Sequence, residues 1–155
     1  MTARHWLGLA GWWVLCFSAA AMGAPFIPGE WYAALRKPAW SPPSWLFGPV
    51  WSALYTMMAV AAWLVWRSGP SAARRRSLAA FLVQLALNAL WTPLFFGLRA
   101  PGVAFAEILL LWVAIAWTMA AFRSVHRAAV WLLAPYLAWV SFAAALNFAL
   151  WRLNP

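Results

Sequence analysis

Five long apolar segments constrain this chain more than any other feature of its sequence. Charged or Pro/Gly-rich breaks separate the segments, which cover approximately residues 6–23, 45–66, 78–98, 102–122 and 128–150. A helix needs about 20 apolar residues to cross a bilayer. We therefore expect an all-α integral membrane bundle of five transmembrane helices, a single domain over residues 1–155 with a long structured first loop.

The low content of charged residues supports the same conclusion. Of the 155 residues, 67% are hydrophobic and 8% are charged, whereas a soluble domain has about 25% charged residues. Eleven Lys/Arg and two acids, Glu30 and Glu107, give a net charge of +9. Because the basic residues lie between the apolar segments, they indicate helix orientation and contact with anionic headgroups. We expect a multi-pass membrane protein with no nucleic-acid partner.

The first apolar segment has two interpretations. Arg4 and His5, followed by an apolar stretch and the small residues of "SAAAMGA", are typical of a secretory signal. Against this, the stretch is rich in Trp, and four further apolar segments follow it. We interpret it as a retained helix; a mature N-terminus near Ala24 would indicate a cleaved signal instead.

The distribution of basic residues predicts an orientation. With five spans, seven bases lie on the N-terminal side: Arg4, Arg67, Arg74, Arg75, Arg76, Arg123 and Arg127. Four lie on the opposite side: Arg36, Lys37, Arg99 and Arg152. The positive-inside rule then predicts a cytoplasmic N-terminus and an external first loop. The residues do not distinguish an inner from an outer membrane.

Polar residues of the segments gather in the half of the bundle beneath the first loop. In the third segment, Gln84, Asn88 and Thr92 have i, i+4, i+8 spacing, which places them in one stripe of a helix. Since unpaired amides are unfavourable in lipid, the stripe should face the bundle interior. Two roles remain open: hydrogen bonds that join helices, or contact with a ligand.

Glu107 is the one acid within an apolar segment. Intramembrane carboxylates often mark proton or ion routes. Glu107 has no second acid nearby for a relay, it lies near a helix N-terminus, and Arg99 is close enough in sequence to pair with it. We therefore favour a structural role.

The chain contains fifteen tryptophans. Those near segment ends fit the aromatic belt of a membrane interface. Five lie too deep for this role: Trp51, Trp91, Trp112, Trp117 and Trp139. A buried indole N–H needs an acceptor, so these residues predict internal packing or the wall of a cavity for a flat aromatic guest.

The first loop is rich in Trp and Pro. Its stretch "EWYAALR" predicts a short amphipathic helix over residues 30–36, and "SPPSW" predicts Ser44 as the N-cap of the second segment. Pro49 is compatible with the first turn of that helix. The prolines make the loop stiff, as a lid of fixed shape would be.

Three motifs resemble one known family. They are "WYAALRKPAWSPPSWLFGPVWSALY", "QLALNALWTPLFFG" and "PYLAWVSFAAALNFALWR". Together they resemble the translocator protein family, also called tryptophan-rich sensory proteins or peripheral benzodiazepine receptors (TspO/MBR). The resemblance implies a five-helix bundle, usually a homodimer, with a pocket beneath the first loop. Members bind tetrapyrroles such as protoporphyrin IX, cholesterol or other sterols, and isoquinoline- and benzodiazepine-type drugs.

The resemblance also implies particular pocket residues. Carried over motif by motif, they are Phe47, Gly48, Trp51, Asn88, Trp91, Trp139, Ala143 and Leu146. Bacterial members have been described as degrading protoporphyrin photo-oxidatively, and the two implicated tryptophans match Trp51 and Trp139. No metal-ligand spacing of Cys and His occurs, and we expect neither a metal nor a cofactor.

One motif departs from the family pattern. The sterol motif of the last segment corresponds here to Leu146, Phe148 and Arg152, with Phe148 where the family has Tyr. The missing hydroxyl weakens the case for a sterol and favours a tetrapyrrole-preferring, bacterial-like member.

Three functions follow as hypotheses. The leading one is a membrane receptor, sensor or carrier for porphyrin-like ligands. The alternative is a Trp-dependent, light- and oxygen-dependent porphyrin-degrading enzyme, since no hydrolytic set of side chains is present in the segments. The third is a dimeric membrane scaffold, for which "FLVQLALNAL" is the predicted contact segment.

Overall fold

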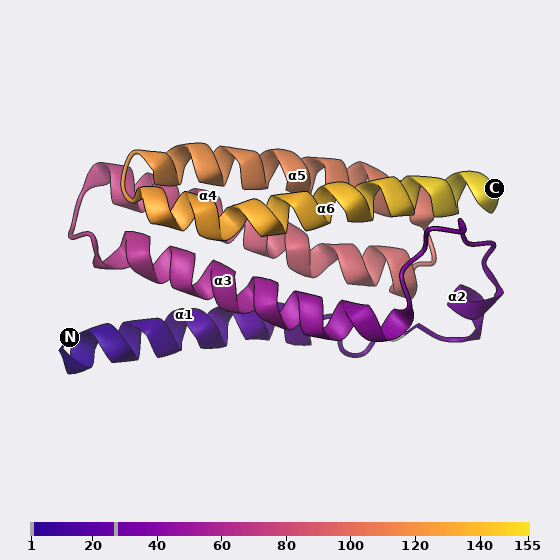
Figure 1. The fold of residues 1–155 in the computed structure, drawn as a ribbon, viewed down its shortest axis with the longest axis horizontal. Helices are drawn as coiled ribbons and strands as arrows, with labels where there is room; N and C mark the ends of the chain where they lie inside the picture. The colour runs from indigo at the N-terminus through magenta and orange to yellow at the C-terminus, as the bar shows by residue number, and fades with distance from the viewer. Residues whose placement is uncertain (1, 27) are drawn as a thin grey trace.

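The computed structural model describes residues 2–26 and 28–155, and this part of the chain is helical without strands. Figure 1 shows the long helices lying side by side, with the short α2 at one end of the bundle. The elements are α1 (Ala3–Ala21), α2 (Glu30–Ala34), η1 (Ser44–Leu46), α3 (Phe47–Arg67), α4 (Ala72–Thr92), η2 (Pro93–Gly97), α5 (Pro101–Arg123) and α6 (Arg127–Leu153).

Within the described residues, four helical stretches are long and apolar enough to cross a membrane. They are Ser44–Arg67, Ala72–Gly97, Pro101–Arg123 and Arg127–Leu153. The helix α1 falls outside this set because Arg4 and His5 lie in its first turn and several of its residues are Trp or Gly. The structure therefore confirms an all-helical membrane protein, while the fifth predicted span is not confirmed.

One predicted boundary is clearly wrong. The helix α4 begins at Ala72 and not near residue 78, so Arg74 and its two neighbours lie inside the helix and not in a loop. The Ser71 hydroxyl caps this helix by accepting a hydrogen bond from the Arg74 backbone N–H at 3.0 Å. Gly69 has φ +87°, a left-handed conformation that suits glycine and turns the chain from α3 into α4.

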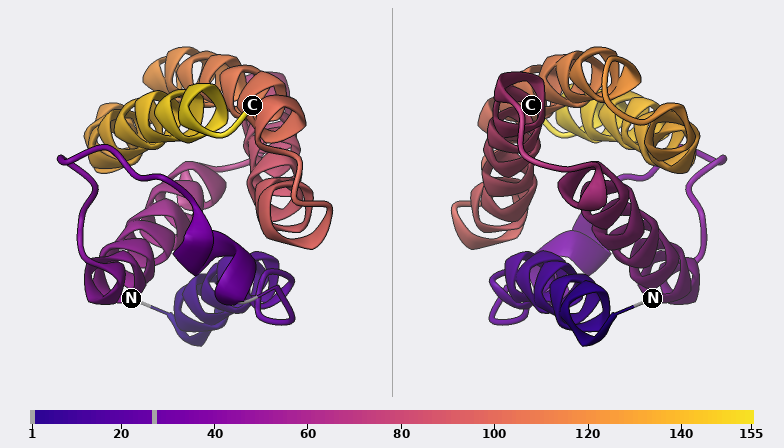
Figure 2. Two further views of the ribbon diagram at one scale, coloured as in Figure 1. Left: turned by 90° about the vertical axis from the view of Figure 1, so that its right-hand side faces the viewer. Right: turned by 90° about the vertical axis from the view of Figure 1, so that its left-hand side faces the viewer.

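The long helices form a ring. The helix α1 packs on α3 and α4, α3 packs on α6, α6 on α5, and α5 on α4. Figure 2 shows this ring end-on, with α2 across one opening. The close α1–α3 contact depends on Gly8, because a Cβ at this position would collide with the Trp66 ring. The ring encloses an interior that each long helix can reach.

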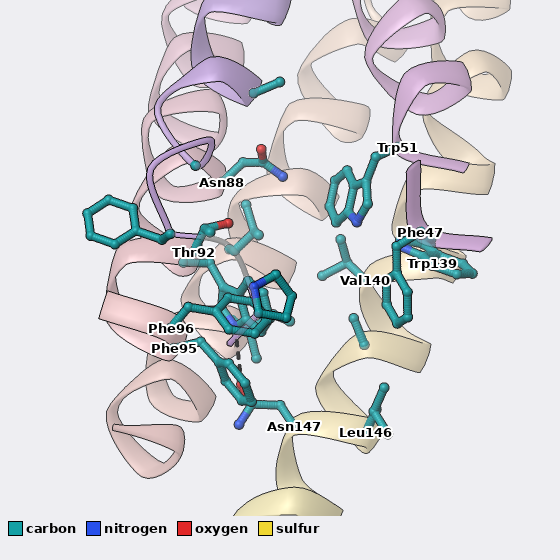
Figure 3. A pocket seen from close by; sticks show the side chains of 18 of the residues that line it. Phe47, Trp51, Asn88, Thr92, Phe95, Phe96, Trp139, Val140, Leu146 and Asn147 are labelled. Carbon is teal, nitrogen blue, oxygen red and sulfur yellow. Dashed lines mark hydrogen bonds between the residues drawn. The ribbon is translucent and has the colours of Figure 1, made fainter. Parts of the chain in front are cut away.

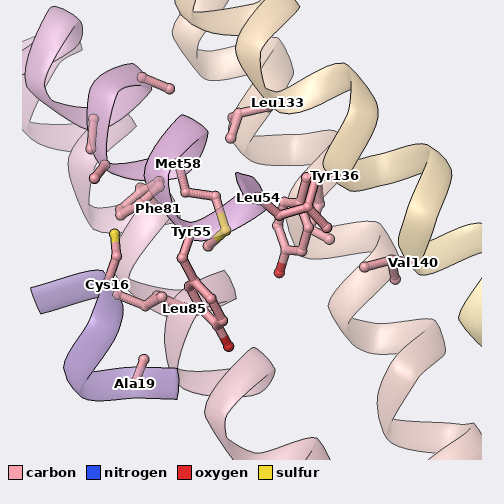
Figure 4. Packing of buried hydrophobic residues seen from close by; sticks show 14 of the residues in the cluster. Cys16, Ala19, Leu54, Tyr55, Met58, Phe81, Leu85, Leu133, Tyr136 and Val140 are labelled. Atoms are coloured by element: carbon pink, nitrogen blue, oxygen red, sulfur yellow. The ribbon is translucent and has the colours of Figure 1, made fainter. Parts of the chain in front are cut away.

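The half of the ring nearer the N-terminus is filled with apolar side chains. Figure 4 shows part of this core, including Cys16, Met58 and Phe81. Phe81 is fully buried, stacks on Phe122 with ring centroids 6.0 Å apart, and meets Trp12 edge to face at 5.7 Å. This end of the bundle is a close-packed core.

The loop between α1 and α3 lies over the other end of the ring. Its helix α2 ends at Ala34, two residues short of the prediction, because Leu35 is already extended. The Lys37 ammonium donates to the carbonyls of Tyr32, Ala33 and Leu35 at 2.6, 3.2 and 3.2 Å. These bonds satisfy carbonyls at the helix C-terminus and fix the shape of the loop.

The predicted N-cap of α3 is also corrected. Ser44 is the first residue of the 3₁₀ turn η1, Pro43 is its N-cap, and neither Ser44 nor Leu46 makes a side-chain cap. The prolines alone set the entry into this helix. Further along the loop, the Arg36 backbone N–H donates to the Asn154 side-chain oxygen at 2.9 Å, and the Asn154 amide donates to the Arg36 carbonyl at 3.0 Å. Asn154 therefore ties the loop to the end of α6.

Candidate functional site

A cavity of about 360 Å³ lies under the first loop. Seven of the eight predicted pocket residues line it: Phe47, Trp51, Asn88, Trp91, Trp139, Ala143 and Leu146. The eighth, Gly48, is exposed on α3 and does not line the cavity. Figure 3 shows side chains of α4 and η2 on one side of the cavity and those of α3 and α6 on the other.

A buried network of hydrogen bonds forms the floor of the cavity. The Tyr55 hydroxyl donates to the Asn88 side-chain oxygen, and the Asn88 amide donates to the Tyr136 hydroxyl at 3.0 Å. Tyr136 in turn donates to the Gln84 side-chain oxygen at 3.0 Å. The polar stripe of α4 therefore does face the interior: Gln84 and Asn88 join three helices, while Asn88 and Thr92 also line the cavity.

One side wall is built from α4 and η2. The Trp91 indole N–H donates to the Asn147 oxygen at 3.1 Å, and the Asn147 amide donates to the Pro101 carbonyl at 2.7 Å. Pro93 cannot continue the α-helical pattern, and η2 is a π-helical turn in which the Leu98 N–H donates to the Pro93 carbonyl at 2.9 Å. This wider turn places Phe95 against Trp91, with stacked rings 4.9 Å apart.

The opposite wall is built from α3 and α6. The Trp51 ring lies 5.6 Å from that of Tyr55, and Phe47 meets Trp139 edge to face at 5.9 Å. The indole N–H of Trp139 is buried and has no acceptor among the described residues. A buried N–H normally finds a partner, so the unpaired N–H of Trp139 is an exception in this wall.

Three deep tryptophans line the cavity, but the other two do not. Trp117 is 60% exposed on the outer surface of α5. Trp112 is also on the outside, where its indole N–H donates to the Ser141 hydroxyl at 2.8 Å. For these two residues the prediction of internal packing is wrong: both indoles face outward, and for Trp112 the Ser141 hydroxyl satisfies the N–H.

The predicted Glu107–Arg99 pair does not form. Both carboxylate oxygens of Glu107 are buried without a partner among the described residues. Arg99 is exposed in the turn before α5, where it has φ +52°. Glu107 does not line the cavity either.

The residues of the degenerate sterol motif point in different directions. Leu146 lines the cavity, whereas Phe148 is 45% exposed and packs on Phe105 at 5.2 Å. Arg152 is exposed one turn further along α6. Leu146 and Phe148 therefore do not share one surface.

Sequence reasoning missed contributions from the loop and from α5. Phe26 and Tyr32 cover the cavity from the loop, and Ile108 and Leu111 close it from α5. The α5 residues are ordinary aliphatic residues with no distinguishing pattern. Phe26 had a weak signal in the sequence, since it lies between Pro and Gly residues. In the structure its ring packs directly on Gly97, where an added Cβ would lie 2.7 Å from the nearest ring carbon. Burial raises the pKa of Tyr32, which therefore stays neutral over the cavity.

The lining determines what the cavity can do. All lining side chains are uncharged, most are aromatic or aliphatic, and the polar ones are amides, hydroxyls and indole N–H groups. Among the described residues, no cluster of His, Cys, Asp or Glu could hold a metal ion. The site can therefore bind an apolar, aromatic molecule and orient it through a few hydrogen bonds.

The fold and this pocket together define a class of protein: a helical membrane protein with a largely apolar cavity within its bundle. The sequence comparisons then specify the family within this class. The chain belongs to the TspO/MBR family, whose model matches residues 8–152. This membership identifies it as a membrane sensor or receptor.

Three relatives illustrate the similarity. Protein CrtK of Rhodobacter capsulatus is 44% identical over 149 residues, which cover 94% of this chain and 92% of that protein. The human translocator protein is 40% identical over 157 residues, covering 98% and 93%. The tryptophan-rich sensory protein of Cereibacter sphaeroides is 42% identical over 139 residues, covering 90% and 86%.

Proposed function

We propose that the chain is a receptor or sensor that binds a flat, hydrophobic tetrapyrrole such as protoporphyrin IX in the cavity beneath the first loop. The observation that carries this proposal is the convergence of Trp51, Trp91 and Trp139 on one uncharged cavity of about 360 Å³. Aromatic walls stack on a planar ring system, and the amide and hydroxyl groups of Asn88 and Thr92 in the lining offer hydrogen bonds to its edge. Flat isoquinoline- and benzodiazepine-type molecules have the same properties.

The charge of the lining restricts how a tetrapyrrole would lie. Because no basic side chain among the described residues lines the cavity, the apolar macrocycle would lie inside it, and the carboxylates would extend toward the loop and the membrane surface. The cavity is at the small end of the range for ligand sites, about 300–1,000 Å³. Binding of a large macrocycle therefore includes a displacement of the loop. The divided sterol motif gives no support for a sterol on α6.

Titration of protoporphyrin IX into the purified protein, followed by Trp quenching and by porphyrin absorption, tests the proposal. The double variant Trp51→Phe/Trp139→Phe should weaken binding about tenfold, since two stacking indoles are lost. The matched control Trp117→Phe/Trp131→Phe removes two exposed indoles and should leave the affinity unchanged. Equal affinities for both double variants would refute binding in this cavity.

A second candidate function is photo-oxidative degradation of the bound porphyrin. It is favoured by one observation: Trp51 and Trp139 both line the cavity, so each indole could donate an electron to an excited porphyrin. Under light and oxygen, the porphyrin absorption should then decay, and Trp51→Phe should abolish the decay while binding persists. An unchanged decay rate in Trp51→Phe would exclude a role for this indole.

We also propose that α1 is a fifth span and that the protein is a homodimer. The 19-residue helix α1 packs on α3 and α4 and exposes apolar residues such as Leu7, Trp13 and Val14 outward. Reporter fusions at the two termini should lie on opposite sides of the membrane; fusions on the same side would contradict a fifth span. The dimer contact is proposed for residues 81–90, where Leu82, Val83 and Leu90 are exposed.

A further inference from the structure

The end of the bundle opposite the loop is strongly basic. Figure 1 shows that the α3–α4 turn and the α5–α6 turn lie at the same end as the N-terminus. Seven of the eleven basic residues belong to this end: Arg4, Arg67, Arg74, Arg75, Arg76, Arg123 and Arg127. Both acids of the chain, Glu30 and Glu107, lie in the other half. This end therefore has a positive charge that the protein itself does not balance.

A groove between α4 and α5 opens at this basic end. It has a volume of about 450 Å³, and its lining includes Arg76, Ser124 and Trp117 together with small side chains such as Ala73 and Ala80. Trp117 lies about 9 Å below the end of α5, at 1.5 Å per residue. The groove thus runs from the charged surface into the depth of the first acyl-chain carbons.

The polar groups of the groove have a specific hydrogen-bonding pattern. The Ser77 and Ser124 hydroxyls both donate to the Ala121 carbonyl, at 3.0 and 2.8 Å. Both hydroxyl protons are donated in these bonds. Ser124 is exposed, so its oxygen can still accept a hydrogen bond from a ligand. Arg76 is exposed at the same mouth and supplies only donors. The mouth therefore matches a group that combines an anion with a neighbouring hydroxyl.

The start of α4 carries basic residues that no acid of its first turn balances. The first turns of this helix contain Arg74, Arg75 and Arg76 and no acid, although the positive end of the helix dipole disfavours cations there. Arg74 is stabilised because its guanidinium donates to the Trp66 carbonyl, at the C-terminus of α3, at 3.0 Å. Arg75 and Arg76 remain exposed.

We propose that this groove binds an anionic glycerophospholipid from the surrounding leaflet. The phosphate accepts hydrogen bonds from Arg76, a headgroup hydroxyl donates to Ser124, and the start of one acyl chain lies on the alanines beside Trp117. A second copy of the chain fits the mouth of the groove less well; the dimer contact proposed for residues 81–90 lies deeper along α4 and shares only Val83 with the groove. A two-fold axis along the membrane normal brings residues of equal depth together, and Arg75 and Arg76 would then face their own copies.

Lipid retention measured by native mass spectrometry on the full chain tests the proposal. Phosphatidylglycerol and phosphatidylcholine are supplied in equal amounts at 0.5 M salt, which screens diffuse attraction. Phosphatidylglycerol should be retained preferentially, and Arg76→Gln should reduce its retention about tenfold, as for a lost hydrogen bond to a charged group. The control Arg75→Gln removes the same charge one residue away, outside the groove, and should retain the lipid.

Two further measurements separate the other possible occupants. Ala73→Leu fills the groove without a change of charge and should reduce phosphatidylglycerol retention while the oligomeric mass stays constant. A changed mass with unchanged lipid retention would instead make the groove a contact between copies and overturn the proposal. So would equal losses in Arg75→Gln and Arg76→Gln, or displacement of the bound lipid by excess inorganic phosphate.

Discussion

The two ends of this bundle are built from the same helices but differ in how they fill the interior. At the end near the N-terminus, Phe81, Phe122 and small alanines pack together in the interior. At the end beneath the loop, Trp51 and Trp91 stand apart around a cavity of about 360 Å³. A void lowers stability because its walls lose contacts.

This difference in packing shows which interactions join the helices and which keep them apart. The network of Tyr55, Asn88 and Tyr136 lies at the boundary between the two ends. Above it, the π-helical turn and the amide of Asn147 fix the walls while leaving the space between them open. We infer that the packed end supplies most of the stability and that the other end supplies the cavity proposed to bind a ligand.

The largest expected effect is on the packed end. Phe81→Ala removes a fully buried ring that contacts Phe122 and Trp12, and should lower the free energy of unfolding by about 3–5 kcal/mol. Phe47→Ala, at the wall of the existing cavity, should cost about half as much or less because it creates little new cavity surface. Denaturant unfolding in detergent measures the free energy of unfolding of both variants. Equal losses of this free energy would show that the two ends do not differ in their contribution to stability.

The next effect is on the boundary network. Tyr136→Phe removes the acceptor of the Asn88 amide and the donor to Gln84, and both partners are buried. It should lower the free energy of unfolding by about 1–3 kcal/mol, the desolvation penalty of unsatisfied polar groups. Tyr32→Phe removes a hydroxyl from the loop and serves as the control. If the two variants unfold alike, the network does not join the helices.

A smaller and more local effect is expected at the loop. Asn154→Ala breaks both hydrogen bonds to the Arg36 backbone, so hydrogen exchange over residues 30–43 should accelerate about fivefold, as for the net loss of about 1 kcal/mol. Exchange in the middle of α3 should stay the same. Acceleration in both regions would show that the loop stabilises the whole bundle and not only the cavity.

The smallest effects concern two turns. Arg99 has φ +52°, and Arg99→Gly should raise the free energy of unfolding by up to about 1 kcal/mol because a left-handed conformation strains a residue with a Cβ. Gly69, at φ +87°, should show the opposite sign on substitution by Ala. Thermal unfolding of Arg99→Gly and Gly69→Ala, each compared with the unchanged protein, measures the two shifts in stability. Shifts of the same sign would mean that backbone strain does not decide the stability of these turns.

Much of the fold was predictable because lipid imposes simple rules. Segment length and Arg-bearing breaks located α3, α5 and α6 within a few residues, since backbone polar groups in a bilayer must be satisfied within the helix. The start of α4 was misplaced because charged residues at a membrane surface continue a helix as readily as they end one. The N-terminal segment was harder because its mixture of Arg, His, Gly and Trp lowers its apolar character.

The site was predictable where its residues were unusual. Amides and indoles in an apolar segment have few reasons to be there, and Asn88, Trp51 and Trp139 do line the cavity. The pattern could not tell inward from outward indoles, because Ser141 satisfies Trp112 from the neighbouring helix. It also could not identify Leu111, which differs from its aliphatic neighbours only in the direction it faces.

The tie between Asn154 and the loop has a consequence for variation in this protein. Asn154 recognises only the main chain of Arg36, through its N–H and its carbonyl. Position 36 can therefore exchange its side chain, and with it the charge presented at the membrane surface, for any residue except proline. Position 154 has no such freedom, because its side-chain amide makes both bonds, so the surface of the loop can vary while its attachment point stays an asparagine.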